Sequence, residues 1–504
     1  MRGDLTIRTV RTSSGATAVQ IIRYERGKRL VVKHIGSAHT DAELLHLKQK
    51  AEIWRERLCV QPSLFGPDVP SAIVDMEHLQ LSTVTHRFAY ETLKRCSSLC
   101  GLDFLPDLYQ DFALMRIIEP SSKMRTLELL RRYFDVSYAL RTLYRLLPKL
   151  VVHKERIETA AYQTACSAFE DPFAIVLYDV TTLYFETHVP NDDLRARGFS
   201  KDDKSKQPQI VIGLLVTARG FPLMHEVYKG NTFEGHTMLG VIQEFQKQHS
   251  GTKPIIVADA AMLSAENMQT LEREGYFYIV GARLANTPQS FVSQITQALP
   301  HKDGCSIRRI YPNRTYQVIC TYSEKRYKKD KREFEKQIER AKSLIARKEP
   351  GKRAKFVKKT KGAQGIFIFD EALKGKAEQL LGIKGYCTNI PEETLSNDRI
   401  VSYYQELWHV EQTFRMSKTD LKARPIFHRT KEAIQAHTLL CFMALMMEKF
   451  LELKTGLSLR CIRDILWNVH EAQIENVVTG QRITLQTNLD EYRLSGLEEA
   501  LKPH

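Results

Sequence analysis

Asp179, Asp259 and Glu411 are the residues of this 504-residue chain whose surroundings most clearly predict chemistry. Asp179 follows the apolar run AIVLY and Asp259 follows PIIVA, so each is expected to end a buried strand. If these strands are neighbours in one sheet, both carboxylates emerge at one edge, where their repulsion favours bound cations. A strand-end Asp is also a common turn former or helix cap, although for the second strand Ser264 is the better-placed cap.

The third carboxylate is expected on a helix formed by NDRIVSYYQELWHVEQTFRMSKTDLK. Tyr404, Glu411 and Lys418 are seven residues apart, about two turns, which places them on one helix face. A Glu within an apolar stripe is unusual without a partner; an ordinary amphipathic helix that tolerates one Glu is the alternative. Lys418 could place a cation against a phosphate, and Tyr404 could stack or hydrogen-bond near a DNA backbone. The same stripe includes Leu407, Trp408, Phe414 and Arg415.

Phosphodiester cleavage is the chemistry that three such carboxylates would support. The reaction needs an activated water or hydroxyl, neutralised charge and a stabilised leaving oxygen, and two divalent ions about 3.5–4 Å apart supply all three. Magnesium prefers oxygen ligands. Asp179, Asp259 and Glu411 are therefore predicted to be catalytic and to hold two Mg²⁺ ions, for which Mn²⁺ can substitute.

The order of elements around the two Asp residues predicts the fold. Residues 173–284 are expected to form strand, strand, strand, helix, strand, helix and strand, with a hairpin turn at Arg219–Gly220 and a helix between Ser264 and Gly275. This is the element order of a ribonuclease-H-like fold, in which a final helix brings a third carboxylate. We expect an α/β protein whose core, residues 171–286 with 384–450, is a mixed sheet with flanking helices.

A long segment, residues 287–383, precedes that helix and is expected to be an inserted α+β domain. Within it, Glu324 to Lys361 holds 17 Lys or Arg and 6 Asp or Glu, most of the chain's net charge of +15. Such a concentration of bases indicates a polyanionic partner. We expect phosphate contacts here, with a solvated helix that binds nothing as the alternative. The bases singled out are Lys325, Arg326, Lys328 and Lys329.

The first 170 residues are expected to be a binding region. Residues 1–65 are predicted to form short strands and a helix near Thr40–Leu58, and residues 60–72 a linker rich in Pro and Gly. Residues 75–170 are predicted to be helical, with basic helices and brief turns that could form a DNA-reading helix-turn-helix module. A plain helical bundle with solvated basic faces is the alternative. Residues 451–504 are expected to form a C-terminal helical tail.

Composition argues against several other classes of protein. The chain is 43% hydrophobic and 26% charged, as ordinary globular proteins are. We find no apolar run of the roughly 18 residues that a membrane span needs and no secretory signal at the start, so we expect an intracellular protein without membrane contact. Nine cysteines, with only Cys96 and Cys100 closely spaced, suit neither a zinc site nor a disulfide framework. His225 and His236 stand alone, and lone histidines are seldom metal ligands.

A family resemblance enters with the segment YQELWHVEQTFRMSK. It resembles the Tyr-Arg-Glu-Lys signature of DDE insertion-sequence transposases, Y-x2-R-x3-E-x6-K. Tyr404, Glu411 and Lys418 match in identity and spacing, whereas Leu407 occupies the Arg position, so the role of that Arg falls to Arg415 or another base, or is absent. LYDVTTLYFE and VADAAMLSAENMQTLEREGYFYIVGARL look like the two Asp motifs of this family, and similar segments extend the resemblance over nearly the whole chain.

The resemblance implies metal-dependent cut-and-paste transposition by a ribonuclease-H-like core with a domain inserted before the Glu. In such enzymes water nicks the element end and the freed 3′-hydroxyl attacks DNA, often through a hairpin intermediate. It implies that Asp179 bridges both ions and that Asp259 and Glu411 chiefly hold one each. The implied partners are double-stranded DNA, as terminal inverted repeats and target, and a second copy of the chain, in a bacterial or archaeal nucleoid. Two alternatives stay open: a ribonuclease-H-like nuclease without strand transfer, and an inactivated or domesticated copy that only occupies DNA.

Overall fold

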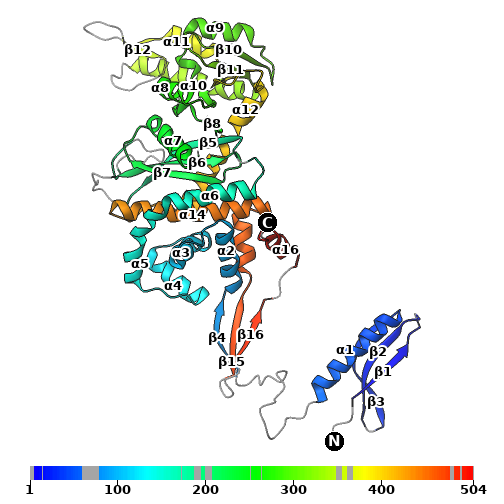
Figure 1. Ribbon diagram of the computed structural model, residues 1–504. Coiled ribbons are helices and arrows are strands. Elements are labelled where there is room, and N and C mark those ends of the chain that lie inside the picture. Colours follow the sequence, from blue (N-terminus) through cyan, green and yellow to red (C-terminus); the bar gives the residue numbers. More distant parts are fainter. Residues whose placement is uncertain are drawn as a thin grey trace. The chain divides into compact units, whose positions relative to one another are not determined.

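The computed structural model of the chain (Figure 1) forms two compact units, one of Met1–Thr83 with Gln473–Thr484 and one of Val84–Ala472 with Leu485–His504. The linker expected over residues 60–72 lies outside the described residues. The structure describes residues 5–13, 15–25, 27–59, 79–171, 173–186, 194–198, 207–249, 251, 253–262, 264–347, 355–359, 367–476, 482–487 and 491–502.

An eight-stranded mixed sheet, ordered β10-β11-β14-β9-β8-β5-β6-β7, forms the centre of the larger unit. β5 pairs antiparallel with β6, and β6 with β7, while β5 and β8, and then β8 and β9, pair in parallel. These five strands have the ribonuclease-H-like arrangement that the sequence predicts, and α7 (Met238–Gln248) and α8 (Ala265–Arg273) occur where helices were expected. The strands are β5 (Ile175–Tyr184), β6 (Gln209–Thr217), β7 (Pro222–Lys229), β8 (Ile255–Ala258) and β9 (Tyr278–Ala282).

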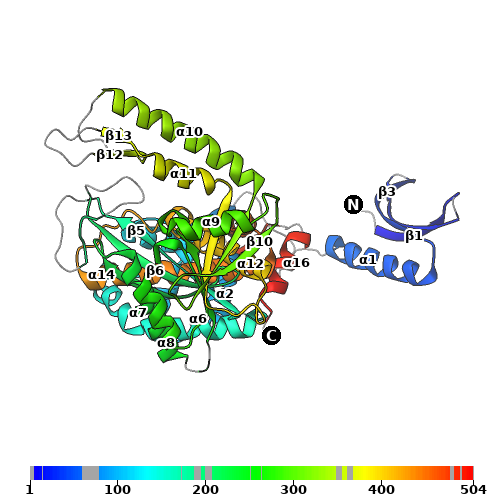
Figure 2. The same cartoon turned by 90° about the horizontal axis from the view of Figure 1, so that it is seen from above.

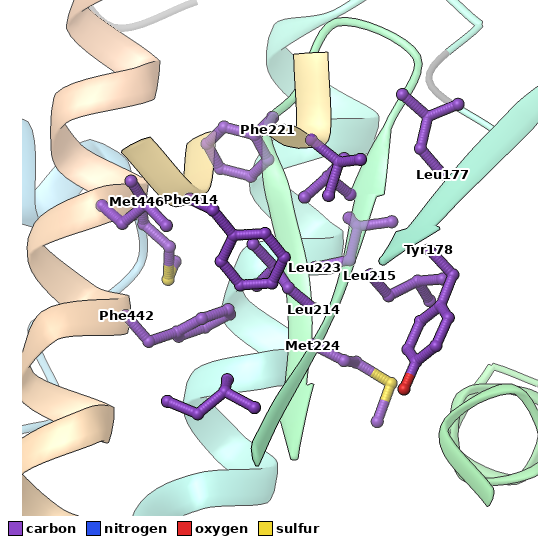
Figure 3. Packing of buried hydrophobic residues seen from close by; sticks show 14 of the residues in the cluster. Leu177, Tyr178, Leu214, Leu215, Phe221, Leu223, Met224, Phe414, Phe442 and Met446 are labelled. Carbon is purple, nitrogen blue, oxygen red and sulfur yellow. The ribbon is translucent and has the colours of Figure 1, made fainter. Parts of the chain in front are cut away.

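Both faces of this sheet are covered, which explains why its strands are continuous apolar runs. All nine residues of β6 are buried. On one face, Phe414 lies between Phe442 of the long helix α14 (Lys431–Thr455) and Leu214 of β6 (Figure 3). On the other face, the Tyr178 hydroxyl donates a hydrogen bond of 2.8 Å to Thr237, directly before α7. The core therefore fixes β5 from both sides.

Helix α14 is the central helix of the larger unit. The helices of the N-terminal half are α2 (Arg87–Leu99), α3 (Asp107–Ile118), α4 (Lys123–Phe134), α5 (Leu140–Leu146) and α6 (Lys154–Ala168). Helix α14 lies between the sheet and helices α2, α3 and α4 (Figure 1), and it packs on β7, α2 and α3, whereas α6 packs directly on β7. By length and composition alone α14 would suit a membrane span, which corrects our expectation from the sequence, but 94% of its apolar stretch is buried in the protein.

The smaller unit contains a three-stranded antiparallel sheet and helix α1 (Asp41–Cys59). Thr40 caps α1, since its hydroxyl accepts a hydrogen bond from the Glu43 backbone at 3.3 Å. Val19, Ile21 and Ala51 form its own small core. The sheet consists of β1 (Leu5–Arg11), β2 (Thr17–Glu25) and β3 (Lys28–Ala38).

The C-terminal region is not wholly helical, which corrects our expectation of a helical tail. Besides α15 (Leu459–Trp467) and α16 (Glu491–Ala500), it contains β15 (Glu471–Asn476) and β16 (Arg482–Gln486). These strands form a sheet in the order β16-β15-β4, in which β4 is Leu79–Thr85. The Ser82 hydroxyl and the Glu475 carboxylate are 3.5 Å apart across it. A partner strand from the N-terminal half thus stabilises an extended conformation here.

The segment before the third carboxylate is only partly separate from the core. β10 (Ser306–Ile310), β11 (Gln317–Tyr322) and β14 (Ile383–Thr388) extend the central sheet beyond β9. The remainder projects from the core as α10 (Glu324–Arg347) and α11 (Glu371–Gln379) with the short pair β12 (Val357–Lys359) and β13 (Phe367–Phe369) (Figure 2). Phe334, Ala341 and Phe356 form a small core of their own under α10.

Candidate active site

Asp179 and Asp259 occupy neighbouring positions of the backbone. Tyr178 and Ala258 are the last parallel pair of β5 and β8, and the two Asp residues follow that pair directly. Paired strands are roughly 4.8 Å apart, so the two residues start close together. Asp259 ends its strand as predicted, but Asp179 does not: β5 continues to Tyr184 because β6 still pairs with it, as Asp179↔Leu214. Asp179 is half-buried, whereas Asp259 is exposed.

The helix expected to carry Glu411 is interrupted. Helix α12 spans Asn397–Gln405, and Glu406 is the residue between it and α13 (Leu407–Arg415). Met416–Asp420 then forms a π-helical turn. At the first interruption the Glu406 amide donates to both Ser402 and Tyr403 at 3.2 Å. The single continuous helix predicted here is therefore wrong, because it is interrupted at Glu406 and ends in the π turn that contains Lys418. The shared face of Tyr404, Glu411 and Lys418 stays a prediction.

Tyr404 nevertheless connects α12 with the second Asp. Its hydroxyl lies 3.3 Å from Oδ1 of Asp259, which also accepts a 2.6 Å bond from the Ala260 amide. Burial raises the pKa of the Tyr404 phenol, and the negative charges of Asp259 and Glu411 raise it further. Both carboxylates therefore act on one phenol, although Glu411 itself is an exposed residue of α13.

Lys384 is a residue of this site that the sequence reasoning missed. It lies near the start of β14, with its ammonium group 4.5 Å from the centre of the Tyr404 ring. Burial lowers the pKa of Lys384 and Arg326 lowers it further, whereas the charges of Asp259 and Glu411 act in the opposite direction. Lys384 thus places a cation between the acidic residues and the basic helix. The feature of the sequence that could have indicated Lys384 is a Lys inside the strand-like segment IKGYCTNI.

A cavity of about 590 Å³ connects Asp259 with the projecting elements. Asp259, Tyr404 and Lys384 line it together with Arg326 of α10. Gly281 is also at its wall, where a Cβ atom would come within 2.5 Å of the Tyr404 hydroxyl, so the position requires glycine. The cavity joins carboxylates and bases in one space, as a site for a phosphate chain would.

The four bases singled out on α10 are all exposed, but only Arg326 lines this cavity. Arg326 pairs with Asp330 at 3.3 Å and Lys328 with Glu324 at 3.5 Å, so helix neighbours partly offset their charge. The apolar side of this helix packs through Phe334 and Ala341 against Phe356.

Lys418 and Arg415 occupy different surroundings. Lys418 is half-buried beside Thr181 and Leu183 of β5, two and four residues beyond Asp179, and Phe414 lines the same small cavity. Alternation along a strand places Asp179 on that same face of the sheet. Arg415 is exposed.

Asp179, Asp259 and Glu411 are of the residue types that bind divalent cations, but their side chains do not form one cluster in the structure. Oxygen ligands from two adjacent strands and a helix packed on β5 suit a hard cation. Among the residues that the structure describes, however, no three His, Cys, Asp or Glu side chains form a cluster able to hold a metal ion. Glu411 would have to approach the two Asp residues. His225, by contrast, is buried 3.7 Å from Glu158 and stacks on Phe442, as expected of a structural histidine.

The profile of the family Transposase DDE domain matches residues 172–447, more than half of the chain. The chain belongs to the DDE transposase family. This enzyme family acts on DNA and generally uses divalent metal ions. The matched residues include Asp179, Asp259 and Glu411 and the whole segment between them. No curated protein matches the chain.

One solved structure similar to this transposase is titled "Cryo-EM structure of piggyBac transposase synaptic complex with hairpin DNA (SNHP)". The two chains are 13% identical, with a TM-score of 0.38 over 90% of this chain and 81% of that chain. A likeness this weak carries no argument about function.

Proposed function

We propose that this transposase belongs to an insertion sequence, binds the ends of its own element and catalyses strand cleavage followed by strand transfer. The observation that carries the proposal is the placement of Asp179 and Asp259 directly after the last parallel pair of β5 and β8, with Glu411 acting on Tyr404 beside them. Carboxylates placed in this way suit phosphodiester chemistry. The substrate is double-stranded DNA, and we propose that two copies of the chain act together on it.

We assign Asp179, Asp259 and Glu411 as the catalytic residues and the ligands of two Mg²⁺ ions, with Mn²⁺ as a substitute. Such ions neutralise the phosphate and favour ionisation of the attacking water or 3′-hydroxyl. The chain's own contribution is orientation and charge. Tyr404 fixes an oxygen of Asp259, and Lys384 places a positive charge near both Asp259 and Glu411. Leu407 stands where the family signature has an Arg. Lys384 thereby supplies the positive charge that this Arg would provide.

The test is metal-dependent cleavage of labelled terminal DNA by purified Glu411→Gln, Asp179→Asn and Asp259→Asn. Each amide keeps the shape but removes the charge that retains a cation. We expect each variant to fold and bind the ends, to lose nicking and strand transfer by a factor of about 10³ or more, and two changes to cost little more than one. Glu406→Gln, five residues before Glu411, is the matched control and should cleave like wild type.

The same assay separates the alternatives. Wild-type protein that cleaves terminal DNA without joining it to a target would be a nuclease. Wild-type protein that binds the ends without cleaving them, with either Mg²⁺ or Mn²⁺, would be an inactive DNA-binding copy. Wild-type-like cleavage by Glu411→Gln would remove Glu411 from the site.

A further inference from the structure

A second cavity, of about 460 Å³, lies away from the carboxylates where the helical N-terminal half meets the segment after the π turn. Ser122 and Lys123 at the start of α4 form one wall, and Lys422 and Arg424 form another. The second wall is tied to the end of β5, since the Ile426 amide donates to the Tyr184 carbonyl at 3.2 Å. Tyr184 is five residues beyond Asp179, roughly 17 Å along the strand.

The lining of this cavity is strongly basic. None of the described residues that line it is acidic. Lys123 is only 8% exposed and Arg116 likewise 8% exposed. The basic lining groups are Arg116, Lys123, Lys422, Arg424, His428 and His437.

These buried cations have neutral partners. The Lys123 ammonium group is 3.1 Å from Nδ1 of His437, whose Nε2 is 2.9 Å from the Ala423 carbonyl. His437 thus takes one of three ammonium hydrogens. Arg116 donates to the carbonyl oxygens of Leu421 and Lys422 at 3.4 and 3.3 Å.

The charges on these groups act on one another. Burial and the nearby Arg116 charge together lower the pKa of Lys123 to about 7, while burial, Lys123 and Arg116 lower the pKa of His428 to about 4. Burying positive charges together without acidic partners costs free energy, and a bound anion would offset that cost. The N-terminus of α4, a helix of 12 residues, adds a favourable dipole for an anion.

The rim carries aromatic surface. Phe427 is 74% exposed and Tyr144 is 55% exposed, and both line the cavity. Large exposed aromatics beside bases are the combination that binds unpaired nucleotides, in which the base stacks and the phosphate meets the charge.

We propose that this cavity binds one nucleotide of the DNA substrate, with its phosphate at Lys123 and Arg116 and its unpaired base on Phe427. The proposal rests on the proposed function, because the bound nucleotide would belong to the DNA that is cleaved at the carboxylates. The bound nucleotide would be separated from the cleaved phosphate by about five base-pair steps of 3.4 Å if the strand follows β5. The site would hold an opened strand in position during cleavage.

The experiment is an interference assay with the full-length protein and a duplex carrying the terminal repeat. Single phosphates are replaced one at a time by neutral methylphosphonate, and binding is measured by titration without metal. For wild type we expect one position, or two adjacent ones, whose neutralisation weakens binding about tenfold beyond other positions. Lys123→Met should bind about tenfold more weakly, lose about one unit of salt slope, and show no further loss at those positions.

Two further variants and a control complete the design. Lys422→Asn is a second charge variant, because Lys422 is exposed and its φ of +45° is a conformation that Asn tolerates. Phe427→Ala should weaken binding to a duplex with an unpaired nucleotide at the sensitive position and leave a fully paired duplex unaffected. Lys247→Met, an exposed lysine of α7, should keep the wild-type pattern. Additive losses in both Lys123→Met and Lys422→Asn would overturn the proposal.

A titration with inorganic phosphate tests whether the cavity binds a phosphate of DNA or a free phosphate ion. If millimolar phosphate raised the Tm of wild type but not of Lys123→Met, while no methylphosphonate position were sensitive, the cavity would hold free phosphate and the DNA assignment would be wrong. Cleavage of the same duplex is measured in parallel. Wild-type protein that shows the interference pattern but never cleaves would contradict the proposed function and leave the nucleotide site standing.

Discussion

At the scale of single residues, Tyr404 is the side chain that links the acidic residues of the site. Its hydroxyl donates a hydrogen bond to Asp259, and the Lys384 ammonium group lies 4.5 Å from the centre of its ring. A buried phenol with these neighbours stays protonated and therefore donates to the carboxylate. We propose that Tyr404 orients Asp259 and limits where Lys384 can lie.

Replacing Tyr404 by Phe tests this positioning role. The ring and its packing remain, but the hydrogen bond to Asp259 is lost, so we expect about a tenfold lower cleavage rate and a higher Mg²⁺ concentration for half-maximal rate. Binding of terminal DNA without metal should not change. Tyr403→Phe is the matched control, because the Tyr403 hydroxyl contacts Arg399 instead. An unchanged metal dependence in Tyr404→Phe would contradict the role.

At the scale of elements, the strands were predictable and the last helix was not. Apolar runs and turn residues locate β5 to β9, because each strand is buried and its limits are local. The spacing of apolar residues predicts one helix over residues 397–422, but the structure interrupts it at Glu406 and forms a π turn at Met416–Asp420. Lys384 was missed for a related reason, since its contact with Tyr404 joins β14 and α12 and has no local signal.

The basic helix α10 carries a prediction about salt. Lys325, Lys328 and Lys329 are exposed, and neutralising all three to Gln should weaken DNA binding and lower the slope of log K against log salt by roughly two to three units if each meets a phosphate. A binding curve measured at several salt concentrations gives that slope. The folded state should be unaffected, because the small core of Phe334, Ala341 and Phe356 under α10 is untouched.

Three exposed lysines outside α10 provide the control for that experiment. Neutralising Lys149, Lys229 and Lys247 removes the same formal charge from other elements. We expect this triple variant to keep the wild-type slope. Equal slopes in all three proteins would show that α10 is a solvated helix without a nucleic-acid ligand.

Helix α14 contains a buried acid that predicts how stability depends on pH. Glu448 is fully buried, and burial raises its pKa to about 8; within the described part of the chain its carboxylate oxygens have no hydrogen-bond partner. The unfolded chain releases this proton near the ordinary pKa of 4.5, so between about pH 4.5 and 8 the folded state binds more protons. The free energy of unfolding therefore falls as pH rises through that window.

Glu448→Gln should remove this pH dependence. We expect its Tm to exceed that of wild type by about 2–5 °C at pH 8 and to match it near pH 4.5, as measured by thermal unfolding across that range. Glu432→Gln, at an exposed position in the first turn of α14, should follow the wild-type curve. A wild-type slope retained in Glu448→Gln would mean that another group causes it.

At the scale of the whole molecule, the catalytic sheet and the N-terminal sheet belong to different compact units. The larger unit contains every acidic and basic residue assigned to cleavage, together with helices α2 to α6 packed around α14. Since α14 contacts both the sheet and those helices, a fragment ending near residue 170 would expose apolar surface that α14 normally covers. The helices of the N-terminal half therefore pack as part of the larger unit, whereas β1 to β3 and α1 have a small core of their own.

Removal of residues 1–59 accordingly tests how recognition is divided. β1 to β3 and α1 have their own core of Val19, Ile21 and Ala51, so the remaining chain should fold with an unchanged Tm. Because a catalytic site must accept any target sequence, we expect reading of the element ends to involve the region before it. The shortened protein should retain metal-dependent cleavage at high concentration but lose about tenfold or more of its preference for terminal over random duplex, measured by competition binding. A preference equal to that of wild type would place end recognition in α2 to α6 or in the projecting elements around α10, and footprinting of the shortened protein on terminal DNA would then distinguish these two regions.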